Sequence, residues 1–234
     1  MKTALTAAIR RHTSAGLREA LKQLRSELAV QRRHRTGARR ARQYTNNIKL
    51  HLGSGPNYKS GWVNVDLFHA SADLALDLRE PLPFPTASVT DIYSEHVFEH
   101  FTFPDEANRL LWECLRVLTP GGIFDVGVPD TEYAIRNYYV ERNPELLAYA
   151  RAHWHREPWC DLPLHQLNYH FRQGAEHKYA WDFETLENVL AKAGFVTIGR
   201  REFDAALDDP KRREGTLYMR ARKSPAATTI QKAG

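Results

Sequence analysis

The sequence predicts an α/β fold with a mostly parallel sheet, because short apolar strands alternate along it with turns and helices. Residues 48–52 have the apolar character of a buried strand, and Gly53-Ser54-Gly55 follows them as a turn. A second strand over residues 62–66 ends in the carboxylate of Asp66. Further strands are expected at residues 74–78, 89–93, 123–128, 195–203 and 216–222, the last two as an antiparallel pair.

Three helices follow from apolar spacing and from residues that start or stop helices. Leucines at positions 17, 21, 24 and 28 predict an amphipathic helix over residues 14–30, followed by an arginine-rich linker over 31–47. Asp105 is expected to cap a second helix that runs toward Leu118. Asp182 is expected to cap a third helix over 183–193, which Gly194 ends. The proline-rich stretch 79–85 predicts a loop.

The basic charge of the chain is concentrated near its start. The chain has 234 residues and a formal net charge of +5, but residues 1–45 hold twelve Lys and Arg against two Glu, so the remainder is acidic. We therefore expect a basic, partly helical extension over 1–45, one α/β domain over 46–223, and a flexible tail over 224–234. Within the domain, residues 131–180 break the alternation and are rich in histidine and aromatic residues, as in an inserted lid.

The amino-acid composition also indicates the cellular location of the protein and its binding partners. No stretch approaches the roughly 20 apolar residues needed to cross a bilayer, and the two cysteines have neither metal nor disulfide spacing. Both observations favour a soluble protein in the reducing cytoplasm. The simplest interpretation of the basic helix is a solvated extension whose leucines rest on its own domain. Contact with an anionic membrane, a nucleic acid or a protein partner stays open, as does an organelle transit peptide.

The glycine turn and the following acid form the first candidate site. Gly53 and Gly55 let the backbone turn sharply and approach a ligand with no Cβ in the way. Asp66, at the end of the neighbouring strand, is the type of group that accepts hydrogen bonds from a ribose diol. The pattern therefore predicts a nucleotide-like cofactor at the carboxyl end of the sheet.

Five segments follow one another in a characteristic order: Leu50-His51-Leu52-Gly53-Ser54-Gly55, Asp66, Asp77-Leu78, Asp91-Ile92-Tyr93-Ser94-Glu95-His96 with Glu99-His100, and Arg116-Val117-Leu118-Thr119-Pro120-Gly121-Gly122. Together they resemble the class I S-adenosylmethionine-dependent methyltransferases of the small-molecule or glycan branch. The resemblance covers about residues 48–222. It implies a Rossmann-like, seven-stranded, mostly parallel sheet with helices on both faces and an antiparallel last strand.

The resemblance also implies S-adenosylmethionine as the cofactor. Gly53 and Gly55 would face its methionine part, Asp66 its ribose hydroxyls and Asp77 its adenine amino group. The complete implied set is Gly53, Ser54, Gly55, Asp66, Leu67, Asp77, Leu78, Ser94 and Glu95. Two departures stand out, since the first motif lacks a third glycine and residues 58–61 leave little room for a helix before the second strand. A dinucleotide oxidoreductase is the nearest rival, but its G-x-G-x-x-G triplet is absent.

His96-Val97-Phe98-Glu99-His100 matches the H-x-x-E-H pattern of zinc peptidases, in which two histidines share one helix face. The segment follows a strand directly, and no partner helix supplies an obvious third ligand. We therefore expect no metal here. Glu99 and His100 are expected to bond neighbouring loops, with Glu95 and His96 at the lip of the cofactor pocket.

Methyl transfer is an in-line displacement at a sulfonium carbon, so the protein must mainly align the acceptor and exclude water. A hydroxyl acceptor also gains from a base of near-neutral pKa, which favours His177 or His96 as the catalytic residue. The aromatic lid favours a glycan or other small-molecule hydroxyl as acceptor. RNA or protein methylation is the alternative among enzymes, although the acidic body argues against a nucleic-acid partner. A non-catalytic cofactor-binding or adaptor protein is the alternative of another class.

Overall fold

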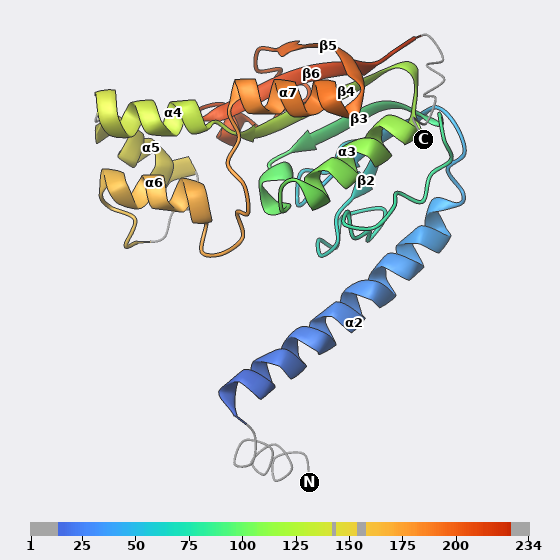
Figure 1. The fold of residues 1–234 in the computed structure, drawn as a ribbon, viewed down its shortest axis with the longest axis horizontal. Helices are drawn as coiled ribbons and strands as arrows, with labels where there is room; N and C mark the ends of the chain where they lie inside the picture. Colours follow the sequence, from blue (N-terminus) through green and yellow to red (C-terminus); the bar gives the residue numbers. More distant parts are fainter. Residues whose placement is uncertain (1–13, 142–143, 154–157, 226–234) are drawn as a thin grey trace, which may run out of the picture.

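The computed structural model describes residues 14–141, 144–153 and 158–225 (Figure 1). Its centre is a six-stranded sheet of order β2-β1-β3-β4-β6-β5. Strands β1 to β4 pair in parallel, and β6 runs antiparallel to both β4 and β5. The expected mostly parallel α/β sheet with an antiparallel last strand is confirmed. The strands are β1 Ile48–Leu52, β2 Val63–Val65, β3 Val89–Glu95, β4 Leu118–Pro129, β5 Phe195–Arg200 and β6 Thr216–Lys223.

The sheet has six strands in the described part of the chain, whereas seven were expected. The predicted strand at 74–78 contributes a single bridge, between Leu74 and Val65. Helix α2 (Ala15–Ala41) packs so closely beside it that a Cβ on Gly37 would lie 2.3 Å from the carbonyl oxygen of Ala75. The Asp77 N–H donates to His34 of the same helix at 3.2 Å. Residues 74–78 therefore contact α2 through their backbone instead of forming a further strand of the sheet.

Helix α2 is longer than predicted and covers most of the expected linker. Ser14 caps it by accepting the Leu17 N–H at 3.2 Å, and good helix formers carry it to Ala41. Its buried positions, Val30, Gly37 and Ala41, lie in the second half, and two of them are too small to stand out as apolar signals. The leucines of the first half are 40–56% exposed, and Figure 1 shows this half extending away from the sheet. The interpretation that they rest on their own domain is therefore wrong.

Two helices, α3 (Asp105–Val117) and α7 (Phe183–Ala193), pack together beside the sheet. Asp182 caps α7 by accepting the Thr185 N–H at 2.8 Å, and Gly194 ends it with a positive φ, as predicted. Asp105 does not cap α3, because it is already the first helical residue. Glu106 instead accepts the N–H of Thr102 at 2.8 Å, which closes the start of this helix.

The region predicted as a lid forms a separate group of short helices beyond the carboxyl end of β4 (Figure 1). These are α4 Thr131–Arg136, the π-helical turn η2 Asn137–Glu141, α5 Pro144–His153 and α6 Pro163–Arg172. The chain returns to the sheet at Trp181, which is fully buried and bridges to Asp130. No helix within the described ranges is both long and apolar enough to cross a membrane. Residues 1–13 and 226–234, which include the ends of the predicted extension and tail, lie outside the described residues.

Candidate functional site

The glycine turn after β1 leaves an open backbone surface. Gly53 and Gly55 have φ angles of 64° and 48°, which side chains other than glycine adopt at a cost. A Cβ on Gly53 would lie 2.2 Å from Cγ2 of Val97, whereas a Cβ on Gly55 would meet nothing within 4 Å. Gly53 is thus required by packing, and Gly55 borders open space that a ligand can approach closely.

Asp66 holds this turn in place. Its Oδ2 accepts the Gly55 N–H at 3.0 Å, and its Oδ1 accepts the N–H groups of Phe68 and His69 at 2.8 Å each. A carboxylate has about four acceptor positions, so one on Oδ2 remains for a ribose hydroxyl. The carbonyl of Leu67, the next residue, accepts a hydrogen bond from Arg33 of α2 at 3.0 Å.

Asp77 and Leu78 lie where the chain meets α2. Burial would raise the pKa of Asp77, but hydrogen bonds from Arg79 outweigh it and hold the pKa below its ordinary value. Arg79 contacts the carboxylate at 2.8–3.1 Å and also pairs with Glu27 of α2 at 3.0 Å. The residue expected to meet the adenine amino group is therefore held by an arginine and tied to the N-terminal helix.

The end of β3 contributes buried polar groups next to the turn. Ser94 pairs with Leu52 in the sheet, and the hydroxyls of Ser54 and Ser94 are buried without a hydrogen-bond partner among the described residues. Glu95 is buried too, which raises the pKa of its carboxyl group, although Arg212 and Tyr218 oppose the shift. The Tyr218 hydroxyl donates to it at 3.0 Å. Unsatisfied hydroxyls beside an open glycine turn fit a polar ligand at this edge.

A loop between β5 and β6 reaches the same edge, and sequence reasoning missed it. Asn57, just after the glycine turn, donates to Asp209 of this loop at 3.0 Å, and the Lys59 ammonium donates to the carbonyl of Leu207. The loop is anchored by the ion pair of Arg201 with Asp208, whose two hydrogen bonds are 2.6 Å long. In the sequence, the charged residues at 208–212 could have indicated a functional loop, but no local pattern relates them to residues 57–59.

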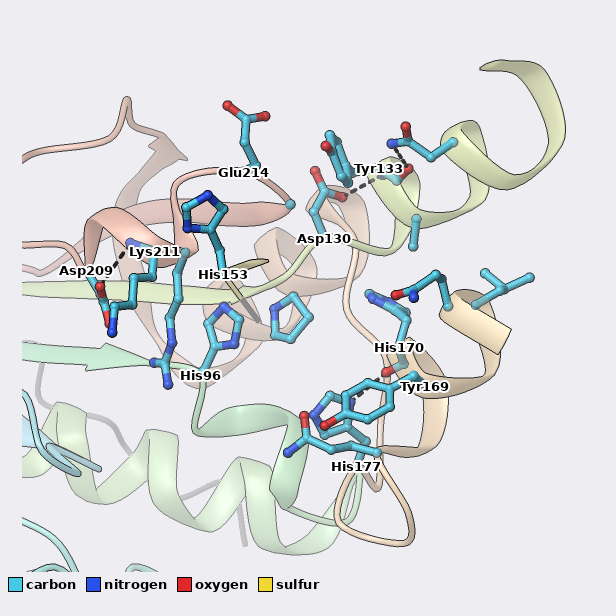
Figure 2. Close-up of a pocket in the computed structure, with 18 of the residues that line it drawn as sticks. His96, Asp130, Tyr133, His153, Tyr169, His170, His177, Asp209, Lys211 and Glu214 are labelled. Carbon is cyan, nitrogen blue, oxygen red and sulfur yellow. Dashed lines mark hydrogen bonds between the residues drawn. The ribbon is translucent and has the colours of Figure 1, made fainter. Parts of the chain in front are cut away.

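A cavity of about 430 Å³ opens between this loop, the lid helices and the end of β3 (Figure 2). Asn57 and His96 border it on the side of the sheet, and Asp130 stands at the end of β4. Lid side chains close it on the other side, among them Tyr133 and Tyr169 together with several histidines. The cavity is therefore lined by polar and aromatic groups and lies next to the glycine turn.

The two histidines predicted as the base both line this cavity but make different contacts. His96 Nε2 lies 2.9 Å from Oγ1 of Thr216, which itself donates to the Arg212 carbonyl, so His96 is the donor and its Nδ1 carries the lone pair. That Nδ1 lies 3.7 Å from Oε1 of Glu99. Burial and then the charge of Arg212 lower the pKa of His96 well below its ordinary value.

His177 follows lid helix α6, and its Nδ1–H donates to the carbonyl of His170 at 2.6 Å (Figure 2). This bond fixes the tautomer and puts the lone pair on Nε2. The H-x-x-E-H segment does not form the α-helix that a zinc peptidase pattern requires, because only Phe98–His100 is helical, as a 3-10 turn, and His96 has a φ of 55°.

These features define an α/β protein with a nucleotide-type cofactor turn and a neighbouring cavity lined in part by the lid. Residues 57–126, from the end of the glycine turn into β4, match the model of a methyltransferase domain. The match supports an enzyme of the S-adenosylmethionine-dependent methyltransferase type, with S-adenosylmethionine as its cofactor. No curated protein matches the chain.

Solved methyltransferase structures also match the chain, at low identity and with TM-scores below 0.5. An S-adenosylmethionine-dependent methyltransferase from Mesorhizobium loti is 18% identical, with a TM-score of 0.46, over 77% of this chain and 92% of that one. The 1,6-didemethyltoxoflavin-N1-methyltransferase of Burkholderia thailandensis is 16% identical, with a TM-score of 0.46, over 95% and 90%. The CurJ carbon methyltransferase is 14% identical, with a TM-score of 0.43, over 77% of this chain, which spans about half (49%) of that chain. At such identities the likeness does not extend to activity or substrate.

The residues of the glycine turn fit S-adenosylmethionine. Gly55 borders open space, and Asp66 keeps one acceptor position for a ribose hydroxyl. The buried hydroxyls of Ser54 and Ser94 have no hydrogen-bond partner among the described residues. When bound there, the cofactor supplies an electrophilic methyl group. The chain's own contribution is to hold the turn, to line the neighbouring cavity and to orient the acceptor.

Proposed function

We propose that the protein transfers a methyl group from S-adenosylmethionine to a hydroxyl of a glycan or another small molecule. The observation that carries this proposal is the cavity of about 430 Å³ beside the glycine turn, which has the size and composition of a small-molecule site. Tyrosines of the lid offer faces on which sugar or aryl rings stack, and Asn137 and Gln166 line the same space. Its charged lining residues, three acidic and two basic, do not favour a polyanionic acceptor such as RNA.

The surroundings of the two candidate bases support His177 over His96. Both histidines line the cavity, but burial lowers the pKa of His96 well below its ordinary value and so weakens it as a base, whereas the lone pair of His177 lies on Nε2. In this proposal His177 accepts the proton of the acceptor hydroxyl as its oxygen bonds to the methyl carbon, and the sulfonium leaves as a neutral thioether. His96 holds the loop end at Thr216 and orders the cavity wall.

The experiment is a transfer assay with methyl-labelled S-adenosylmethionine against glycan, phenol, amine and RNA panels. We expect label on a hydroxyl acceptor, and the His177→Ala variant should lose most of its turnover, a general base contributing about 10²–10⁴-fold, with cofactor affinity unchanged. His165→Ala is the matched control, because His165 is a lid histidine that pairs with Asp161 at 3.0 Å and lies outside the cavity lining.

Two outcomes would contradict the proposal. Transfer to RNA that depends on salt and disappears when residues 1–45 are deleted would favour the nucleic-acid alternative. Cofactor binding without transfer to any member of the panels would favour a non-catalytic cofactor-binding or adaptor protein.

A further inference from the structure

The strongest unexplained feature outside the cofactor turn is the buried carboxylate of Glu99. Its side chain is 2% exposed, and neither oxygen has a hydrogen-bond partner among the described residues. A buried carboxyl group without partners is costly. Nothing in methyl transfer as proposed above uses this group.

Besides His96, two further imidazoles lie close to this carboxyl group. The ligand atoms of Glu99, His100 and His177 all lie within 4.8 Å of one another, and His100 Nε2 is 3.8 Å from Oε1 of Glu99. Glu99 and His100 belong to the 3-10 turn after β3, while His177 comes from the loop after α6, so the third group arrives from a distant part of the sequence.

Both imidazoles are held in the tautomer that a metal ion requires. His100 Nδ1 donates to the carbonyl of Glu176 at 3.2 Å, and His177 Nδ1 donates to the carbonyl of His170 at 2.6 Å. Each ring therefore presents its Nε2 lone pair, and a backbone carbonyl fixes the opposite N–H. This is the support that metal-binding histidines usually have.

We propose that Glu99, His100 and His177 form a binding site for a divalent transition-metal ion of the zinc class. Two imidazole nitrogens and one carboxylate oxygen suit Zn²⁺ better than Mg²⁺ or Ca²⁺, which prefer all-oxygen sets. Tetrahedral bonds of about 2.0–2.1 Å would place the ligand atoms about 3.3 Å apart, so the three groups, now 3.8 Å to at most 4.8 Å apart, need to close by about 0.5–1.5 Å. Three protein ligands leave a fourth position for water or another small ligand.

The position of the site also gives it a role. The Glu99 carbonyl already accepts the N–H groups of Lys178 and Tyr179 at 2.7 and 3.3 Å, so the loop that follows the lid is attached here by backbone contacts. A metal ion would fasten the same loop through side chains. It would also occupy the Nε2 lone pair of His177, and zinc is therefore expected to inhibit methyl transfer if His177 is the base.

Metal binding is testable without any acceptor. Zinc is titrated into tag-free, metal-free protein in competition with a chromophoric chelator, and zinc content after dialysis is measured by mass spectrometry. We expect one zinc per wild-type chain, and at least ~10-fold weaker binding in His100→Ala and Glu99→Gln, with His165→Ala behaving like the wild type. Because His100 is partly exposed, its truncation keeps the test valid if the Glu99 variant fails to fold.

A second measurement reports the ligand set directly. Cobalt bound at the same site should give the intense visible absorption of a four-coordinate ion in the wild type and in His165→Ala, and lose it in His100→Ala. No stoichiometric zinc in the wild type, or equal affinity in wild type and His100→Ala, would overturn the proposal. Since neither measurement involves methyl transfer, a missing acceptor activity leaves this test unaffected.

Discussion

Replacing Asp66 by Asn tests whether this carboxylate organises the cofactor site. The substitution keeps the size of the side chain and leaves one oxygen for the N–H groups of Phe68 and His69. The other oxygen becomes an NH₂ group that faces the Gly55 N–H, now 3.0 Å from Oδ2, so two donors oppose each other. The glycine turn loses its anchor, and the remaining acceptor position for a ribose hydroxyl disappears.

The minimum expected loss of affinity is that of one of these two interactions, the charge-assisted hydrogen bond to the ribose hydroxyl. Such a bond contributes about 1.5–3 kcal/mol, and each 1.4 kcal/mol corresponds to a tenfold change in affinity. Asp66→Asn should therefore weaken S-adenosylmethionine binding by about 10- to 150-fold, and Asp66→Ala at least as much. Calorimetric titration with S-adenosylmethionine and its demethylated product measures the effect, beside a thermal melt that confirms folding.

Asp91→Asn provides the matched control, because Asp91 is an acid near the opposite end of β3 that pairs with Lys49 at 3.8 Å. Its affinity for the cofactor should equal that of the wild type. A folded Asp66→Asn protein that binds the cofactor with wild-type affinity would refute the assignment of this edge as the cofactor site.

Three further predictions concern the surroundings of the site. Gly53→Ala should destabilise the fold by about 2–5 kcal/mol, through a positive φ and a clash with a neighbouring valine, as measured by urea unfolding. Gly55→Ala should destabilise the fold by only about 1–2 kcal/mol, the cost of its positive φ, but should weaken cofactor binding. Equal losses of stability in the Gly53 and Gly55 variants would contradict the packing argument. Asp208→Asn leaves the buried guanidinium of Arg201 with Asp125 as its remaining ion-pair partner and should lower the unfolding free energy by about 1–3 kcal/mol. Burial lowers the pKa of His51 from 6.5 to about 4, so its neutral form contributes stability above pH 6.5 that is lost toward pH 4, up to about 3 kcal/mol. A His51→Gln variant with the same slope of unfolding free energy over that pH range would count against this assignment.

The parts of the fold that the sequence predicted correctly are those whose signals are local. Strand β1, the glycine turn and the Asp182 cap each depend on residues within a few positions of one another. The continuation of α2 to Ala41 escaped prediction because its contact with the domain uses Gly37, whose lack of a side chain is what allows the approach to Ala75. That same contact explains why the expected strand at 74–78 is only a bridge.

The residues of the candidate site divide in the same way, into those predicted from local motifs and those that only the fold brings together. Gly55 and Asp66, eleven positions apart, were assigned from their motif and meet in one hydrogen bond. His177 and Glu99 come together only because the lid returns across the end of β3, and no periodicity relates residues so far apart. The peptidase pattern directed attention to His96 and His100, whereas the structure groups His100 with a histidine outside that pattern.

The short link between β1 and β2 was the main departure from the methyltransferase motifs, and the loop before β6 explains how the chain accommodates it. With no helix in this link, Asn57 and Lys59 are held from outside, by Asp209 and by the carbonyl of Leu207. That loop is itself fixed by the buried pair of Asp208 with Arg201, and Tyr93 donates to the same carboxylate at 3.1 Å. The glycine turn therefore depends on side-chain contacts more than on a helix N-terminus, and loss of the Asp208 carboxylate should weaken cofactor binding even though no atom of Asp208 lines the cavity.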